Sequence, residues 1–254
     1  MSAKKKVEKM LDKYELSELL DDTSIDMSPF IEFFLEELGY ESEDGLSEFE
    51  DAFDSALDSL ELEDDVDEDL LWNRTAFLLV SAMMEGDASD YEELYTGLEG
   101  QVVVLTLIAF AAILEDTDEP AWEFLLSLRC YLRDFAETAW RMDGDPEMAS
   151  EMLWQAMEAA RICADSEDYE QCLEIASAAI GVFNDDVEEE AEGMKEAVGL
   201  LWYYMGEGEE DDDTAVEYYQ NAIELLDDDD ILDDPECDET PEILEQLKKD
   251  YGED

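Results

Sequence analysis

The amino-acid sequence predicts an all-α fold on three observations. Apolar residues recur at intervals of three and four almost throughout the chain, as they do on helices that bury one face. Alternation of β-branched residues, which is typical of strands, is nearly absent. The chain of 254 residues is 46% hydrophobic and contains 10 Phe, 11 Tyr and 5 Trp, so it has enough apolar material for a packed core.

Start and stop signals divide the amino-terminal half into helices. Ser28, followed by a proline, predicts an N-cap, and Gly39 predicts the end of the same helix. We expect turns at Gly86, at Gly100 and over 116–120. The helices predicted in this half span residues 3–20, 29–38, 46–60, 70–84, 91–98, 102–114 and 122–140.

Two of these helices have informative patterns. Over 46–60, Phe49, Phe53 and Leu57 share one stripe while acidic residues occupy the other, which indicates a surface helix with one buried side. The apolar run 102–114 has 13 residues, fewer than the roughly 20 that a membrane-spanning helix needs. We therefore expect a buried helix there and no membrane anchor.

The carboxyl-terminal half is predicted to form helical hairpins. Asp145 followed by Pro146 predicts a helix start, and Lys248 and Lys249 lie where the dipole of a terminal helix favours cations. The predicted helices span 146–164, 168–183, 187–205, 214–226 and 241–251. The chain would thus comprise acidic helices over 1–63, an apolar central bundle over 64–142 and hairpins with acidic loops over 143–254.

An internal repeat lies in this last part, where residues 172–180 align with 215–223 at an offset of 43 residues. The segment AVEYYQNAIEL that contains the second copy resembles the second helix of the tetratricopeptide repeat, which has small residues at its first and eighth positions and an aromatic residue between them. These places are occupied by Ala215, Tyr219 and Ala222 in the second copy, and by Cys172, Ala176 and Ala179 in the first.

The resemblance spans about 146–226 and implies stacked helical hairpins that bind other proteins without catalysis. The offset exceeds the family's period of about 34, and the extra residues are expected in acidic loops such as 207–213. The same spacing of small and aromatic residues would also arise from tight antiparallel packing in any helical bundle.

Composition excludes several classes of function. The chain has 77 acidic and 13 basic residues and a formal net charge of −64, so it does not bind nucleic acid or an anionic membrane through its own surface. It contains no histidine, which removes the imidazole base of many hydrolases and the histidine-containing zinc sites. We expect no enzymatic activity, no cofactor and no dedicated metal site.

The few remaining reactive or basic residues are assigned structural roles. The four cysteines form no C-x-x-C pair and are interpreted as reduced core thiols of a cytoplasmic protein. Arg129 and Arg133 are expected to form ion pairs within the chain.

The acidity itself suggests a function. Carboxylates four residues apart on a helix rise by about 6 Å, which lets a helix imitate a row of phosphates. Spread at the duplex value of one charge per about 1.7 Å, the net charge corresponds to about 109 Å, or roughly thirty base pairs, of DNA. In composition the chain is similar to the acidic helical DNA-mimic proteins that phages use against host defence enzymes. This resemblance implies an inhibitor that occupies the nucleic-acid site of a basic partner.

Two alternatives remain open. One is an acidic scaffold or chaperone for basic proteins, with contacts around Tyr204, Tyr218 and Tyr219, and the other is adaptation to high salt. Haloarchaeal surfaces prefer Asp and Arg, whereas this chain has 42 Glu, 35 Asp, 8 Lys and 5 Arg. A homodimer is compatible with every one of these interpretations.

The predicted partner-binding residues are the densest acidic runs. They recur beside helix ends, where stacked hairpins would align them into one stripe. They are Asp64, Asp65, Asp67 and Asp69; Glu188, Glu189 and Glu190; Asp211, Asp212 and Asp213; and Asp227, Asp228, Asp229 and Asp230.

Overall fold

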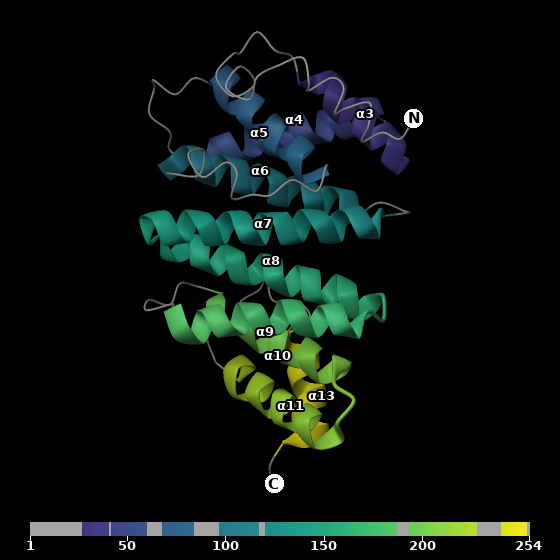
Figure 1. The fold of residues 1–254 in the computed structure, drawn as a ribbon, viewed down its shortest axis with the longest axis vertical. Helices are drawn as coiled ribbons and strands as arrows, with labels where there is room; N and C mark the ends of the chain where they lie inside the picture. Colours follow the sequence, from purple (N-terminus) through teal and green to yellow (C-terminus); the bar gives the residue numbers. More distant parts are fainter. Residues whose placement is uncertain are drawn as a thin grey trace. The chain divides into compact units, whose positions relative to one another are not determined.

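The computed structural model describes residues 27–40, 42–59, 68–83, 97–116, 120–186, 193–227 and 240–252. All regular structure in these residues is helical, which confirms the all-α prediction. The chain divides into two compact units, Met1–Asp143 and Gly144–Asp254 (Figure 1). In the described part of the chain, no helix is sufficiently long and apolar to traverse a membrane. The helix predicted over 3–20 lies outside the described residues.

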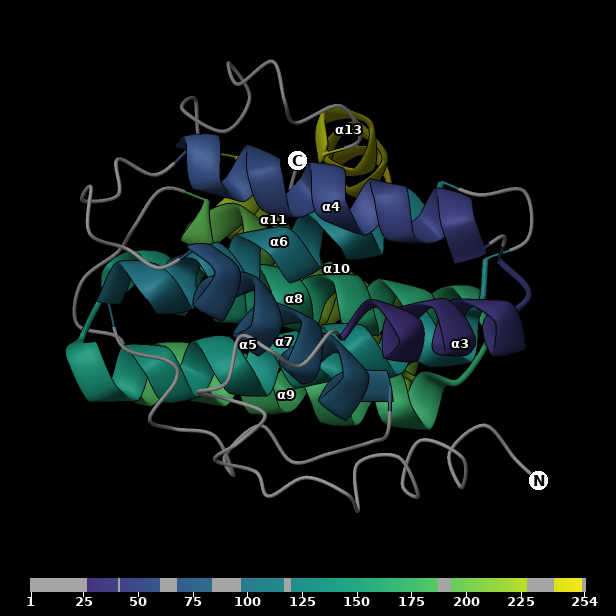
Figure 2. The same ribbon diagram turned by 90° about the horizontal axis from the view of Figure 1, so that it is seen from above.

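The described helices of the first unit pack around a common apolar centre. Helix α4 packs on α3 and α6, α5 packs on α3, α6 and α7, and α6 packs on α7 (Figures 1 and 2). The helices before and after residue 63 therefore contact one another. The bounds are Ser28–Leu38 for α3, Ser42–Ser59 for α4, Glu68–Met83 for α5, Gly97–Glu115 for α6 and Trp122–Asp143 for α7.

Phe49 of α4 lies at the centre of this core. Its ring centroid is 5.0 Å from that of Trp72 on α5 and 5.1 Å from that of Phe110 on α6. Phe49 and Phe53 are buried while Asp51 on the opposite stripe is exposed, as the amphipathic pattern predicted. The predicted surface helix is thus confirmed.

Gly100 does not form the predicted turn. It is buried inside α6, which joins the run 102–114 to the end of the helix predicted over 91–98. Glycine costs a helix about 1 kcal/mol relative to alanine, and the surrounding apolar burial outweighs this cost. Residues 91–96 lie outside the described part of the chain.

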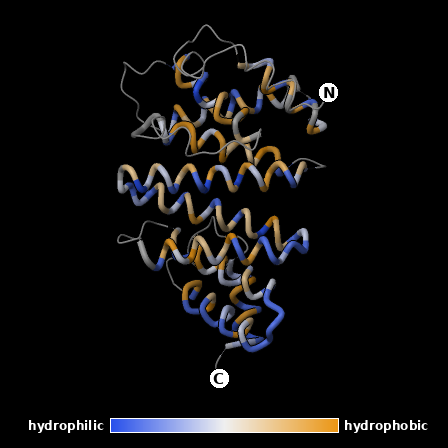
Figure 3. Tube along the Cα trace, viewed as in Figure 1, coloured by the Kyte–Doolittle hydropathy of each residue, from blue (hydrophilic) through white to orange (hydrophobic). Residues whose placement is uncertain are grey.

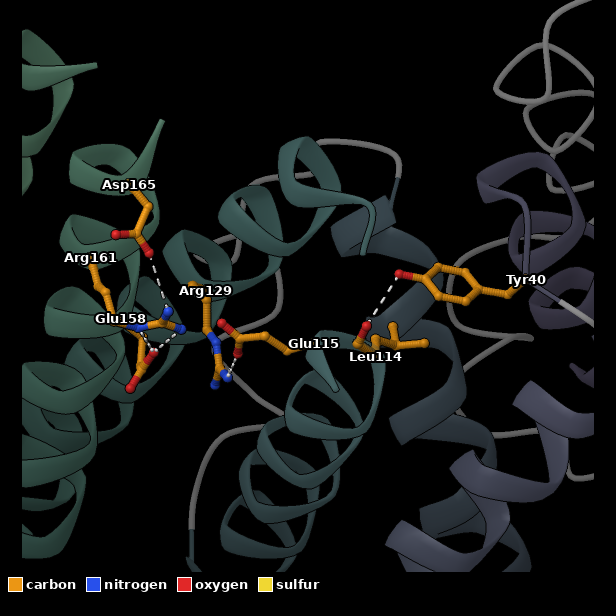
Figure 4. Close-up of polar contacts among 7 residues, drawn as sticks. All are labelled: Tyr40, Leu114, Glu115, Arg129, Glu158, Arg161 and Asp165. Carbon is orange, nitrogen blue, oxygen red and sulfur yellow. Dashed lines mark hydrogen bonds and ion pairs between the residues drawn. The ribbon is translucent and has the colours of Figure 1, made fainter. Parts of the chain in front are cut away.

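Of the two caps predicted for α3, the one at its carboxyl end is confirmed and the one at its amino end is wrong. Gly39 ends the helix with φ of 93°, a left-handed conformation that favours glycine. The N-cap is Met27, which makes no side-chain capping bond, and Ser28 is the first helical residue instead of the predicted cap. Beyond the helix, the Tyr40 hydroxyl donates to the carbonyl oxygen of Leu114 over 3.4 Å (Figure 4). It also accepts from the amide of Ala121 over 3.0 Å.

The described residues of the second unit form two helical hairpins and the helix α13. Helix α10 packs on α8, α9 and α11, and α13 packs on α11 (Figure 1). The bounds are Pro146–Asp165 for α8, Tyr169–Asp186 for α9, Met194–Gly208 for α10, Asp212–Leu226 for α11 and Thr240–Tyr251 for α13. Asp145 caps α8 by accepting from the amide of Glu147, as its position before a proline predicted.

Three residues connect the helices of each hairpin, 166–168 in the first and 209–211 in the second. The acidic loop predicted over 207–213 is therefore too long, because α10 continues to Gly208 and α11 begins at Asp212. Gly206 explains why α10 continues: a Cβ atom there would lie 2.3 Å from the ring of Tyr219, so the glycine lets the two helices approach closely. Close packing between the helices offsets the low helix propensity of glycine.

The internal repeat extends to the helix caps. Asp168 Oδ1 accepts from the amide of Gln171 over 3.3 Å, and Asp211 Oδ1 accepts from the amide of Thr214 over 3.0 Å. The two aspartates are 43 residues apart, like the aligned segments that follow them. The aligned positions Ala176 and Tyr219, and Ala179 and Ala222, are all buried. The two hairpins therefore share their capping and their buried positions, while the tetratricopeptide resemblance stays a prediction.

Candidate acidic surface

A row of carboxylates runs along the solvent face of α11. We call Asp213, Glu217, Glu224 and Asp227 the α11 stripe; all four are exposed, as is Gln220 between them. With Gln220 included, successive positions of this row are three or four residues apart, which keeps them on one face of a helix of 3.6 residues per turn. At 1.5 Å per residue the row is about 21 Å long. The opposite face buries Tyr219, Ala222 and Leu226 against the rest of the unit.

Asp211, Asp212 and Asp213 also stabilise the start of α11. A hydrogen bond from the amide of Thr214, followed by one from its hydroxyl, lowers the pKa of Asp211 below its usual value. Asp212 and Asp213 are exposed in the first turn, where the helix dipole favours negative charge. The connection from α10 to α11 is accordingly one of the most hydrophilic stretches in Figure 3.

The other predicted runs are only partly described. Asp227 is exposed after the last turn of α11 and accepts a hydrogen bond from Lys248 Nζ over 2.5 Å. Asp69 is exposed in the first turn of α5. The runs Asp64, Asp65 and Asp67; Glu188, Glu189 and Glu190; and Asp228, Asp229 and Asp230 lie outside the described residues.

The two described runs of the second unit lie at the two ends of the α11 stripe. Asp213 and Asp227 lie at opposite ends of α11, and Glu217 and Glu224 fill the space between them. These two glutamates were not among the predicted partner-binding residues, because that prediction rested on consecutive acids. Their spacing of three and four residues from the neighbouring members of the row was the available signal.

The first two acidic positions of the α11 stripe recur on α9. Glu170 and Glu174 are exposed there and stand 43 residues before Asp213 and Glu217. We call these two pairs the repeated doublet. The later positions of the row are uncharged on α9, where they are occupied by Ser177, Gly181 and Asn184. The acidic row therefore continues only on α11.

The first unit presents a second acidic row, on α4. Glu50, Asp51, Asp54 and Asp58 are exposed. Glu50, Asp54 and Asp58 are four residues apart and share one face of the helix, and Asp51 is three residues before Asp54. It is shorter than the α11 stripe, because it extends over about two turns of helix.

Arg129 and Arg133 form ion pairs inside the first unit, as predicted. Arg129 is buried and its Nη2 lies 2.9 Å from Glu115 Oε2 (Figure 4). Burial alone would lower the pKa of Arg133, but Asp134 raises it above its usual value. Further pairs join Arg141 to Glu137, and Arg161 to Glu158 and Asp165.

These pairs leave the acidic rows uncompensated. Within the described residues, Asp227 is the one member of the α11 stripe that pairs with a basic side chain, and neither Glu170 nor Glu174 does so. The row therefore presents a continuous negative potential to solvent.

The tyrosines proposed as an alternative contact surface are mostly inaccessible. Tyr204 and Tyr219 are buried, and only Tyr218 is partly exposed, against Trp202 at a centroid distance of 5.4 Å. The Tyr219 ring stacks on Tyr251 of α13 at 4.5 Å. A scaffold could contact Tyr218 here, but not Tyr204 or Tyr219, because the hairpin needs their rings for its own core.

No candidate metal-binding group accompanies this surface in the described part of the chain. No group of three or more acidic or cysteine side chains there could hold a metal ion. Cys163 and Cys172 are free and buried, and burial followed by the nearby Asp168 raises the pKa of Cys172 to about 11. Such a thiol is a poor nucleophile at neutral pH.

Compared with known protein families, with curated proteins and with solved structures, the chain matches none of them.

Proposed function

We propose that this protein is a non-enzymatic inhibitor that imitates nucleic acid and occupies the binding site of a basic, nucleic-acid-binding protein. The observation that carries the proposal is the α11 stripe, a row of exposed carboxylates of which, among the described residues, Asp227 alone pairs with a basic side chain. Inhibition of a host defence enzyme by a phage protein is one setting for such an activity. We place the encounter in the cytoplasm, where free thiols such as Cys163 and Cys172 stay reduced.

The charge density of the α11 stripe, compared with that of DNA, indicates how much of the protein surface a partner would contact. The α11 stripe has four carboxylates over about 21 Å, whereas a single DNA strand has one charge per about 3.4 Å. One helix therefore imitates a strand at reduced density. Glu170 and Glu174 supply further charge from α9, so the partner would contact both hairpins.

The second candidate is an acidic scaffold or chaperone for basic proteins. The packing of α10 against both helices of the preceding hairpin supports it, because stacked hairpins are the arrangement of helical-repeat scaffolds. A scaffold of this kind would bind any polycation of sufficient charge. The mimic would prefer partners that have a nucleic-acid cleft.

The two candidates are separated by competition. Affinity of the full chain would be measured for a panel of basic DNA-binding proteins and for poly-L-lysine, at about 50 and 200 mM KCl, with a duplex of about thirty base pairs as competitor. Mimicry predicts binding that weakens steeply with salt and a site shared with the duplex. Equal affinity for poly-L-lysine and the panel would favour the chaperone, and binding insensitive to salt and duplex would eliminate the mimic.

Replacing Asp211, Asp212 and Asp213 by asparagine tests the surface directly. Asparagine is as good an N-cap as aspartate, so the helical circular dichroism signal is expected to stay unchanged. Binding to the preferred DNA-binding partner should weaken, since three charges at one end of the acidic row are lost.

A further inference from the structure

Tyr203 of α10 has a partly exposed ring within a cluster of tyrosines. Its ring centroid lies 5.1 Å from that of Tyr204 and 6.3 Å from that of Tyr219, and both neighbours are tilted against it. Tyr219, by contrast, is buried and has the ring of Tyr251 stacked on it at 4.5 Å. Among the described residues, no aromatic ring stacks on Tyr203, so its ring contacts solvent at the edge of the cluster.

Glu207, one helical turn after Tyr203, is a carboxylate with a fixed direction. Its Oε1 accepts the hydrogen bond of the Tyr219 hydroxyl over 2.7 Å, so a side chain of α11 orients it. Glu207 is exposed, and within the described part of the chain it pairs with no basic side chain. Its Oε2 is therefore open to a donor from outside the molecule.

Asp165, at the end of α8, adds a second negative charge near the same ring. Burial, followed by the charges of Glu207 and then of Asp165, raises the pKa of Tyr203 above its usual value, so both carboxylates act on its hydroxyl. Asp165 pairs with Arg161 over 3.5 Å, but its side chain is 65% exposed, and exposed pairs are weak. We call Tyr203, Glu207 and Asp165 the Tyr203 site.

A ring edged by carboxylates suits a guanidinium better than an ammonium group. A cation over the face of an aromatic ring is attracted by the electrons of that ring. The guanidinium of arginine is planar and weakly hydrated, so it stacks on the ring and donates to carboxylates in the same pose. The ammonium of lysine is a compact and strongly hydrated charge that does not stack.

We propose that the Tyr203 site binds an arginine side chain of the basic partner, with its guanidinium over the Tyr203 ring and hydrogen-bonded to Glu207. The inference rests on the proposed function only in taking the partner to be basic. It adds a preference for one kind of cation at one place, whereas the α11 stripe attracts every cation through its charge.

The test uses the full chain with ¹³C at the ε carbons of its tyrosine rings. N-acetyl-arginine methylamide and N-acetyl-lysine methylamide are titrated separately at about 0.15 M KCl, and the ring signals are followed by NMR. The signal of Tyr203 is identified by its absence from Tyr203→Phe. The test variant is Glu207→Gln, whose amide oxygen still accepts from Tyr219. The matched control is Glu224→Gln, which removes one exposed carboxylate from the α11 stripe.

The signal of Tyr203 should shift with the arginine amide and saturate, with an affinity at least about fivefold above that for the lysine amide. Glu207→Gln should weaken arginine binding by about fivefold or more, because a charge-assisted hydrogen bond is lost, and Glu224→Gln by less than about twofold. A Tyr203 signal that does not saturate, or equal affinity for the two amides, would overturn the site. Equal losses in the two variants would also overturn it, because binding would then follow total charge.

Failure of this inference is distinguishable from failure of the proposed function. The two amides are measured without any DNA-binding protein, and the competition with duplex DNA does not require an arginine at Tyr203. A chain that shares a partner's site with DNA but has equal affinity for both amides keeps the mimic and loses the Tyr203 site. A chain that selects the arginine amide but binds no DNA-binding protein keeps the Tyr203 site and loses the mimic.

Discussion

Gly206 and Gly181 are both inside helices but have opposite surroundings. A Cβ atom at Gly206 would lie 2.3 Å from the Tyr219 ring, whereas one at Gly181 would meet nothing within 4 Å. Tyr219 cannot move aside easily, since it stacks on Tyr251 and its hydroxyl donates to Glu207 Oε1 over 2.7 Å.

We therefore expect alanine to have opposite effects at the two positions. Gly206→Ala should lower the free energy of unfolding by about 1 kcal/mol, because overpacking of 1–3 kcal/mol exceeds the gain in helix propensity. Gly181→Ala should raise it by about 0.5–1 kcal/mol. Urea unfolding followed by circular dichroism measures both, and an equal rise in the two variants would show that α10 and α11 are not in such close contact.

The buried tyrosines make the second unit sensitive to base. Burial, followed by the hydrogen bond to Glu207, raises the pKa of Tyr219 above its usual value of 10, and burial likewise raises the pKa of Tyr204. The unfolded chain then releases these protons at lower pH than the folded chain. The stability that they contribute is fully present below about pH 10 and is lost as pH rises through the folded values.

Alkaline titration is expected to unfold the second unit above about pH 10. Circular dichroism would report the loss of helix and absorbance near 295 nm would report tyrosinate. Tyr219→Phe should move the unfolding midpoint to higher pH, because phenylalanine has no proton to lose. Tyrosinate that forms gradually from pH 9 without loss of helix would mean that these rings are accessible to solvent.

At the scale of helices, Asp168 and Asp211 each cap the second helix of their hairpin, α9 and α11. Asp168 and Asp211 both accept a hydrogen bond from the amide three residues on. Replacement by alanine should lower the free energy of unfolding by about 1 kcal/mol at either position, while replacement by asparagine should change it little. Chemical denaturation of the four variants tests this, and a loss at only one position would show that the caps are not equivalent.

Helix prediction was accurate where local chemistry and burial agree. Gly39 and the Asp145-Pro146 start gave correct boundaries, because a left-handed glycine and a capping carboxylate act within one turn. Gly100 and Gly206 misled the prediction: Gly100 is buried inside α6, and Gly206 is held in α10 against the ring of Tyr219 on α11. No local pattern reports such packing.

The sequence predicted that the surface is acidic but not how its carboxylates are arranged on α11. The runs around Asp211 and Asp227 were found, while Glu217 and Glu224 were missed. Consecutive acids point in different directions around a helix, whereas residues three and four apart share one face. A search by helical face, applied to the two copies of the repeat, would have found the stripe from the sequence.

For the whole molecule, the net charge of −64 opposes compaction. The Debye length falls from about 30 Å at 0.01 M to about 3 Å at 1 M ionic strength, so added salt screens this repulsion. The thermal midpoint should rise with KCl, with the helical signal already complete at about 0.15 M. Choline chloride at the same ionic strength should have the same effect if screening is responsible.

This titration also bears on adaptation to high salt. A chain that unfolds below about 1 M KCl would favour a halophilic protein over the mimic, since a mimic must be folded where it meets its partner. A midpoint that does not depend on salt would mean that bound cations already neutralise the acidic rows.

Two variants with equal net charge distinguish the effect on binding of where the charges lie from the effect of how many there are. One removes three charges from the α11 stripe by Asp213→Asn, Glu217→Gln and Glu224→Gln. The other removes three from α4 by Glu50→Gln, Asp54→Asn and Asp58→Asn. All six side chains are exposed and are not paired with bases among the described residues, so both variants should fold with small changes in stability.

If the partner reads the α11 stripe, only the first variant should lose affinity, by about tenfold or more, and its dependence on salt should become shallower. The reason is that each phosphate-like contact contributes its own share of the salt dependence. Binding isotherms of both variants with the same DNA-binding protein, at about 50 and 200 mM KCl, measure this. An equal loss in both variants would mean that the partner responds to total charge, as a chaperone for basic proteins would, and that the arrangement of carboxylates on α11 has no recognition role.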